Sequence, residues 1–171
     1  MKIASTFASL MATVLVVAGS LAGKTTTDYD RSANFSAYKT YSWAPSKQAP
    51  KDPLWNRRIT DSIDRQLAAK GLTKVDGPAD LTVTFNGELS QTSSIEGFGT
   101  GGRFLGGTVS LDRVTNVAGT LVVELYDAKA SQLVWRGLAT ETVSDKSEKN
   151  ITMLEKDVEK LFKEYPPKPK K

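Results

Sequence analysis

Hydrophobic residues recur at helical spacing in two stretches of the chain, which predicts two amphipathic helices. The first lies between Asp52-Pro53, a favourable helix start, and Gly71, a favourable helix end. The second is expected to begin at Asp145, with Glu148 completing a capping box, and to end before Pro166. The apolar stripe of the first helix is Trp55, Ile59, Ile63 and Leu67, and that of the second is Ile151, Leu154, Val158, Leu161 and Phe162.

Elsewhere apolar and polar residues alternate with a period of two, which predicts half-buried strands. A polar and glycine-rich stretch, residues 90–107, is expected to be a loop. The predicted strands are residues 24–30, 38–43, 81–86, 108–115, 117–127 and 133–143. The predicted order of elements is therefore β-β-α-β-β-β-β-α.

This order predicts an α+β fold, a two-layer sandwich with two amphipathic helices on one face of a mainly antiparallel sheet. The later strands are joined by connections too short for crossover helices, so they are expected to pair antiparallel. The two helical stripes are expected to pack on Leu121, Val123 and Leu125.

The chain begins with a charged residue, Lys2, followed by an apolar run from Phe7 to Ala18 and by small residues up to Gly23. This pattern predicts a secretory signal peptide over residues 1–23, a single domain over 24–165 and an extended Pro/Lys tail over 166–171. The alternative is an uncleaved membrane anchor, but the run of about 12 residues is shorter than the roughly 20 that a spanning helix needs.

Leu21-Ala22-Gly23 is the start of a lipoprotein box, but Lys24 stands where the lipidated cysteine belongs. The sequence therefore predicts release into the periplasm without a lipid anchor. The box is either a trace of lipoprotein relatives or a chance match in a region of small residues.

The chain of 171 residues contains neither histidine nor cysteine. Their absence excludes Cys–His nucleophile pairs, haem ligation and nearly all zinc sites, and we expect no cofactor and no metal. The formal net charge is +4, and Lys168, Lys170 and Lys171 of the tail carry much of it. Nucleic-acid binding is not expected from so small and localised an excess, whereas peripheral association with an anionic membrane through the tail remains open.

Gly97, Gly99 and Gly102 match the spacing of a dinucleotide-binding loop, but a strand and not a helix is expected to follow them. The favoured interpretation is a mobile hairpin loop. A third interpretation is a partner-contact loop tip formed by Phe98, Arg103 and Phe104, because it would combine aromatic area with a cation.

Two other groups were considered as sites. Asp28 and Asp30 share one face of a predicted strand and could bind a cation, but a solvated strand face is the favoured interpretation. Trp135 beside Arg136 could stack on a ligand, although a core tryptophan with an outward arginine is the usual arrangement.

Several segments resemble a bacterial envelope family catalogued as domain of unknown function 4136. They include Phe35–Trp43, Leu67–Leu72, Leu133–Gly137 and Tyr165-Pro166-Pro167, and the resemblance covers nearly the whole chain after residue 23. The resemblance implies an exported protein, often lipid-anchored, with no established activity and no catalytic residues to carry over.

The sequence thus predicts a non-catalytic binding or structural domain of the periplasm, whose partner is an unidentified envelope protein or cell-wall component. The alternative is a periplasmic hydrolase that uses carboxylates. A pocket with two carboxylates about 5–9 Å apart would favour the hydrolase. The sequence does not determine the oligomeric state.

Overall fold

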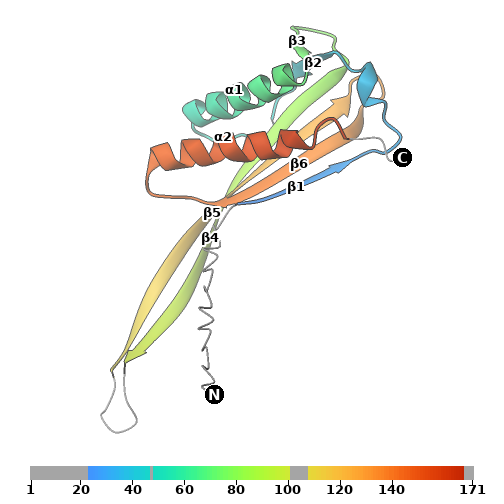
Figure 1. Ribbon diagram of the computed structural model, residues 1–171. Helices are drawn as coiled ribbons and strands as arrows, with labels where there is room; N and C mark the ends of the chain where they lie inside the picture. The colour runs from blue at the N-terminus through green and yellow to red at the C-terminus, as the bar shows by residue number, and fades with distance from the viewer. Residues whose placement is uncertain (1–22, 47, 101–107, 168–171) are drawn as a thin grey trace, which may run out of the picture.

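A computed structural model describes residues 23–46, 48–100 and 108–167 of the chain. Two helices cover one face of a six-stranded sheet, and two strands of this sheet continue beyond the helices as a long arm (Figure 1). The elements are β1 (Lys24–Tyr29), a 3-10 turn (Phe35–Ala37), β2 (Thr40–Trp43), α1 (Pro53–Ala69), β3 (Thr73–Lys74), β4 (Leu81–Thr100), β5 (Thr108–Asp127), β6 (Gln132–Thr142) and α2 (Ser147–Lys163).

The predicted α+β class is confirmed, with the strands in the order β1-β6-β5-β4-β2-β3. Strands β1, β6, β5 and β4 pair antiparallel, as expected from their connections. The other edge is parallel, because α1 forms a crossover between β2 and β4 that returns the chain in the same direction. The predicted signal segment lies almost entirely outside the described residues, as does the end of the tail. In the described part of the chain, no helix is both long enough and apolar enough to cross a membrane.

The prediction for residues 90–127 was wrong in two respects. Residues 90–100 belong to strand β4, and residues 108–127 form one strand rather than two. Asn116, taken as a break, instead lies opposite Thr92 in an unbroken ladder. The ladder satisfies the backbone groups of these polar residues, so a low strand propensity does not end the strand. The short strand β3 was not predicted, and it restores the predicted order of element types.

The structure confirms the predicted start and end of α1 but not the predicted start of α2. Asp52 caps α1 by accepting a 2.8 Å hydrogen bond from the Leu54 N–H, and Gly71 has a positive φ of 84° after the last turn. The predicted capping box of α2 is absent, because the helix begins at Ser147 and its N-cap makes no side-chain bond. The Asn150 side chain instead holds the entry by accepting from the Ser144 N–H at 2.8 Å and donating to the Ser144 carbonyl at 2.7 Å.

The predicted core is confirmed. Most of both helical stripes lies over the sheet in one buried cluster, whereas Trp55, Ile151 and Leu154 of the predicted set are partly exposed. The buried members of that set are Ile59, Ile63, Leu67, Leu121, Val123, Leu125, Val158, Leu161 and Phe162. Trp135 completes the core as the sequence suggested, with its ring 5.1 Å from that of Phe162.

Truncating the core should destabilise the fold. Ile63→Ala and Leu161→Ala remove side chains with no exposed surface, so each should lower the free energy of unfolding by about 2–5 kcal/mol. Urea denaturation followed by circular dichroism measures this. Lys156→Ala, on the exposed side of α2, is the control and should change it by less than about 0.5 kcal/mol. Unchanged midpoints for both core variants would show that the core is placed wrongly.

Candidate functional site

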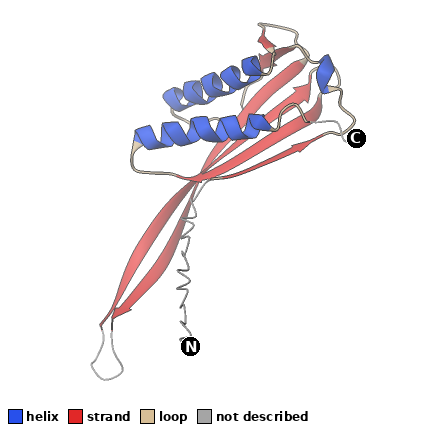
Figure 2. Cartoon of the chain, viewed as in Figure 1, coloured by secondary structure: helices blue, strands red, loops and turns tan. Residues whose placement is uncertain are grey.

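The most prominent surface feature is an arm formed by residues 88–100 of β4 and 108–117 of β5. The two strands remain paired up to Thr100 and Thr108, whereas β6 leaves β5 at Ala118. The ladder therefore continues for ten residue pairs with no third strand beside it, a reach of about 30 Å. Figure 2 shows this two-stranded ribbon running away from the helices.

One side of the arm continues the helix-covered side of the sheet. Strand alternation continues from Val83 and Phe85 of the core, so odd-numbered positions of β4 lie on the side that the helices cover in the body. Leu89 is the first of these positions beyond the body and is 70% exposed. By register, Val117 belongs to the same side, together with the exposed residues Gln91, Ser93 and Thr115. The side of the sheet that the helices bury in the body is therefore uncovered at the base of the arm.

The base of the arm is fastened along the outer edge of β4 by the segment between β2 and α1. The Ala44 N–H donates to the Val83 carbonyl and the Gly87 N–H donates to the Gln48 carbonyl, each at 2.9 Å. The two segments approach closely at Gly87, where a Cβ would lie 3.0 Å from the Pro50 ring and would require that ring to shift by a few tenths of an ångström. Beyond Gly87, no described residue pairs with this edge of β4.

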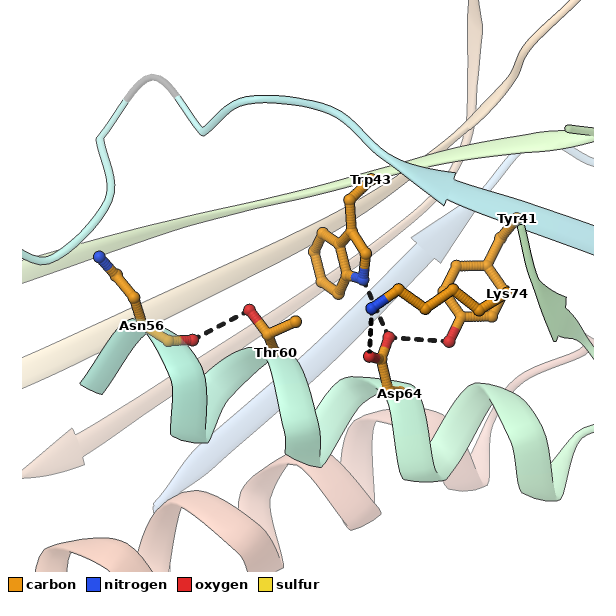
Figure 3. A network of polar contacts seen from close by, with 6 residues as sticks. All are labelled: Tyr41, Trp43, Asn56, Thr60, Asp64 and Lys74. Atoms are coloured by element: carbon orange, nitrogen blue, oxygen red, sulfur yellow. Dashed lines mark hydrogen bonds and ion pairs between the residues drawn. The ribbon is translucent and has the colours of Figure 1, made fainter. Parts of the chain in front are cut away.

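A buried polar network ties the sheet edge that carries this segment to α1 (Figure 3). Asp64 of α1 accepts hydrogen bonds at one carboxylate oxygen from the Tyr41 hydroxyl at 2.7 Å and from the Trp43 indole N–H at 2.9 Å. Its other oxygen pairs with the Lys74 ammonium of β3 at 3.0 Å. Burial, with the Asp64 carboxylate beside it, raises the pKa of Tyr41, so this hydroxyl stays protonated as a donor. One carboxylate therefore joins α1 to β2 and β3.

A second polar group lies at the end of the sheet where β1 ends and β2 begins. It borders a shallow hollow of about 270 Å³ lined in part by Asp30, Tyr38 and Asp127. Backbone N–H donors, first that of Ala130, lower the pKa of Asp127, and the Tyr38 hydroxyl donates to the same carboxylate at 3.0 Å. Burial, with the nearby Asp127, raises the pKa of Tyr38 to about 12. Bonds from Ser32 likewise lower the pKa of Asp30.

These aspartates act as backbone clamps. Asp80 shows this most clearly, because one of its oxygens accepts from the N–H groups of Lys39 and Thr40 and from the Thr40 hydroxyl at 2.9–3.1 Å. These bonds lower its pKa and join the start of β2 to the start of β4. Within residues 23–46, 48–100 and 108–167, no three carboxylates gather closely enough to hold a metal ion.

Of the three sequence-predicted contact residues, the structure describes Phe98 alone. Phe98 was assigned to a loop tip, but it lies in strand β4 opposite Ser110. Arg103 and Phe104 lie outside the described residues. Gly97 and Gly99 of the nucleotide-loop pattern are likewise in β4, and the next described element is strand β5. The backbone therefore lacks the strand–loop–helix geometry of a dinucleotide site.

For the other two predicted candidates, Asp28 with Asp30 and Trp135 with Arg136, the structure agrees with the structural interpretation rather than with ligand binding. Asp28 is exposed, whereas Asp30 follows the end of β1 and accepts from Ser32 and Gln132. Trp135 is fully buried, and Arg136 pairs with Glu124 on the opposite side of the sheet at 2.6 Å.

Sequence reasoning missed the arm and the role of Asp64. The alternation of Val109, Leu111 and Val117 with polar residues was a usable signal for one long strand. Asp64 gave no local signal, because its partners are 10 to 23 residues away along the chain.

Removing the Asp64 carboxylate should loosen the β2–β3 edge. Asp64→Ala leaves the Tyr41 hydroxyl and the Trp43 N–H without their acceptor, so it should lower the free energy of unfolding by about 2–4 kcal/mol. Asp61→Ala, at an exposed position of the same helix, is the matched control and should cost less than about 0.5 kcal/mol. Urea denaturation measures both, and equal effects would contradict a bridging role for Asp64.

Comparison with solved structures supports the fold. A PDZ domain protein from Parabacteroides distasonis is similar over 86% of this chain, with 17% identity and a TM-score of 0.58. The match covers only 36% of that protein's length. PelC from Paraburkholderia phytofirmans, solved as a dodecamer, matches over 81% of this chain and 96% of its own, with 13% identity and a TM-score of 0.49. A minor lipoprotein from Acinetobacter baumannii matches over 74% of this chain and 91% of its own, with 11% identity and a TM-score of 0.36.

No curated protein matches this sequence. At the level of sequence families, the match covers residues 25–167, which include every described helix and strand except the first residue of β1. This extent confirms the resemblance seen in the sequence: the chain belongs to the family described as "Domain of unknown function (DUF4136)".

Proposed function

We propose that this protein is a non-catalytic contact module of the bacterial envelope, exported to the periplasm, and that its arm is the element that makes the contacts. The observation that carries the proposal is the arm itself. Its ladder continues for ten residue pairs past the last strand that supports it, and Leu89 at its base is 70% exposed. A strand edge whose N–H and C=O groups are unpaired is a ready template for pairing with another chain.

The geometry of the base supports this function. An arm can transmit or resist force only if its root is fixed, and the root of β4 is bonded to residues 44–48 on one side and to β5 on the other. The Asp64 network fixes the strand that precedes this segment. The contact surface therefore projects from a rigid body.

The charges favour contact over catalysis. A carboxylate hydrolase needs a general acid whose pKa is raised, so that it holds a proton at neutral pH. Hydrogen bonds instead lower the pKa of Asp30, Asp80 and Asp127, which keeps these groups ionised. Their donors are mostly the backbone that they hold in place, which fits a structural role better than the alternative of a hydrolase.

Export should leave a soluble mature protein. The short apolar run before Gly23 and the Lys24 that replaces a lipidated cysteine predict cleavage near Ala22 without lipid attachment. Mass spectrometry of the native protein from the periplasmic fraction should give the mass of the chain without its first 22 or 23 residues. An intact Met1 end, or partition into detergent, would contradict this part of the proposal.

Shortening the arm should abolish partner capture without unfolding the body. Replacing residues 91–117 with Asn-Gly closes β4 and β5 by a two-residue turn at the Ser90–Ala118 pair and leaves the core intact. Formaldehyde cross-linking in cells, followed by purification of the tagged protein, measures capture of envelope proteins and cell-wall fragments. The shortened variant should lose at least about ten-fold of the captured material, while its circular dichroism spectrum still shows both helices.

Two exposed leucines provide a sharper comparison. Leu89→Asp alters the base of the arm, whereas Leu54→Asp makes the same change on α1, where the leucine is 58% exposed. We expect capture to fall for Leu89→Asp and to persist for Leu54→Asp. Capture that survives both the shortened arm and Leu89→Asp would show that the arm is not the contact element.

A further inference from the structure

The free edge of β4 suggests one particular partner for the arm. In an antiparallel ladder, the N–H and C=O groups of alternate residues point to the same edge. The Gly87 N–H points away from β5, toward Gln48, so the odd-numbered residues beyond it present their backbone groups to the same outer edge. Leu89, Gln91, Ser93, Ile95, Gly97 and Gly99 thus form a row of strand-pairing groups that no described residue uses.

This edge lacks most of the features that usually protect an exposed strand. Natural edges carry charged residues, especially lysine, or proline or bulges, or are very short. Residues 88–100 contain no lysine or proline, and the β4–β5 register runs through them without a shift. The charged residues of this stretch are Glu88 and Glu96. The edge formed by β3 differs, because it is two residues long and carries Lys74.

We propose that this edge pairs antiparallel with the same edge of a second copy of the chain, about a two-fold axis at Ser94. Ser94 is the midpoint of residues 88–100, so this register uses all six outward-facing residues of each copy. Leu89 then lies opposite Gly99, Gln91 opposite Gly97 and Ser93 opposite Ile95. A shift of the axis by one residue in either direction leaves one outward-facing residue of each copy unpaired.

The residue pairs are compatible in charge and size. Glu88 faces Thr100 and Glu96 faces Thr92, so no two carboxylates oppose each other. An axis at Thr92 would place Glu88 directly against Glu96 of the second copy, a repulsive cross-strand pair. The larger residues Leu89 and Gln91 both face glycines. The strand is therefore complementary to itself in this register.

The pairing also gives the two-stranded arm the neighbouring strands that it lacks in a single copy. A two-stranded ribbon is marginal in water, whereas three or more strands with an apolar face are stable. The two-fold axis is perpendicular to the sheet, so the sides that carry Leu89 in both arms join on one side of a four-stranded sheet with a body at each end. This inference rests on the proposed contact function of the arm and names a second copy as the partner.

A single cysteine tests the register, because the chain contains no other. Ser94 faces Ser94 of the second copy at a non-hydrogen-bonded site, where Cα atoms lie about 4.5 Å apart, within disulfide reach. Mild oxidation of full-length Ser94→Cys should therefore give covalent dimers at least about ten-fold faster than Ser90→Cys. In the control the two cysteines are about 27 Å apart, because Ser90 faces Phe98.

Proline substitutions test which edge is used. Ser93→Pro removes an outward-facing N–H of β4 and no bond of the β4–β5 ladder, so it should weaken self-association at least about ten-fold in sedimentation equilibrium. Thr115→Pro makes the equivalent change on the outer edge of β5, opposite Ser93, and should leave association unchanged. Circular dichroism checks that both variants are folded.

Several results would overturn the pairing. They are a wild-type protein that is monomeric at all concentrations, equal cross-linking of the two cysteine variants, loss of association with Thr115→Pro alone, or cross-linking of Ser94→Cys only to another envelope protein. The last result would leave the proposed contact function intact. If the shortened arm lost capture while the wild-type protein was monomeric, the contact function would also stay intact and the pairing between copies would be wrong. The two proposals can therefore fail separately.

Discussion

The structure depends on the antiparallel ladder between β4 and β5, which joins twenty residue pairs at the centre of the sheet and in the arm. In its first part the ladder carries Val83, Phe85, Val123 and Leu125 of the core, where burial under two helices stabilises it. In its second part it continues without helices or neighbouring strands. Because alternation is unbroken, the side of the sheet that is buried in the body is also the side on which Leu89 is exposed at the base of the arm. The same constraint thus produces both the stability of the body and its surface for contact.

Hydrogen bonds of two aspartates stabilise the sheet edge next to this ladder, where β2 pairs with β4. Strand β2 is only four residues long and pairs with β4 through three residues, too little to hold it alone. Asp64 of α1 accepts hydrogen bonds from the Tyr41 and Trp43 side chains of β2. Asp80, just before β4, accepts a hydrogen bond from the backbone N–H of Thr40, the first residue of β2. The segment that follows β2 then runs along β4 up to Gly87 and stops there. The edge of β4 is therefore closed in the body and open in the arm, and the boundary between the two is defined by hydrogen bonds.

This boundary gives the functional proposals their physical basis. Several ionisable groups of the described body, among them Asp80 and Glu124, are used in clamps and ion pairs, which position backbone rather than reacting atoms. The arm offers an exposed leucine at its base and unused strand-pairing groups on one edge. Such features favour association with another surface, and the self-complementary register about Ser94 favours a second copy. Family membership alone does not choose among these functions, because the family is described by its unknown function.

Local patterns in the sequence were sufficient for the helices, the core and the fold class. The stripes from Ile59 to Leu67 and from Val158 to Phe162 each need one buried side, and two such stripes over an alternating sheet lead to a two-layer fold. The arm was not predicted, because its Ser, Asn and Gly residues do not favour strands by themselves, and pairing with the opposite strand makes these residues extended. Asp64 and Asp80 were not predicted either, because a carboxylate acquires its role from donors brought close by folding. The sequence by itself determined which residues are buried; the tertiary structure decided which backbone edge is left open, because that depends on where each neighbouring strand ends.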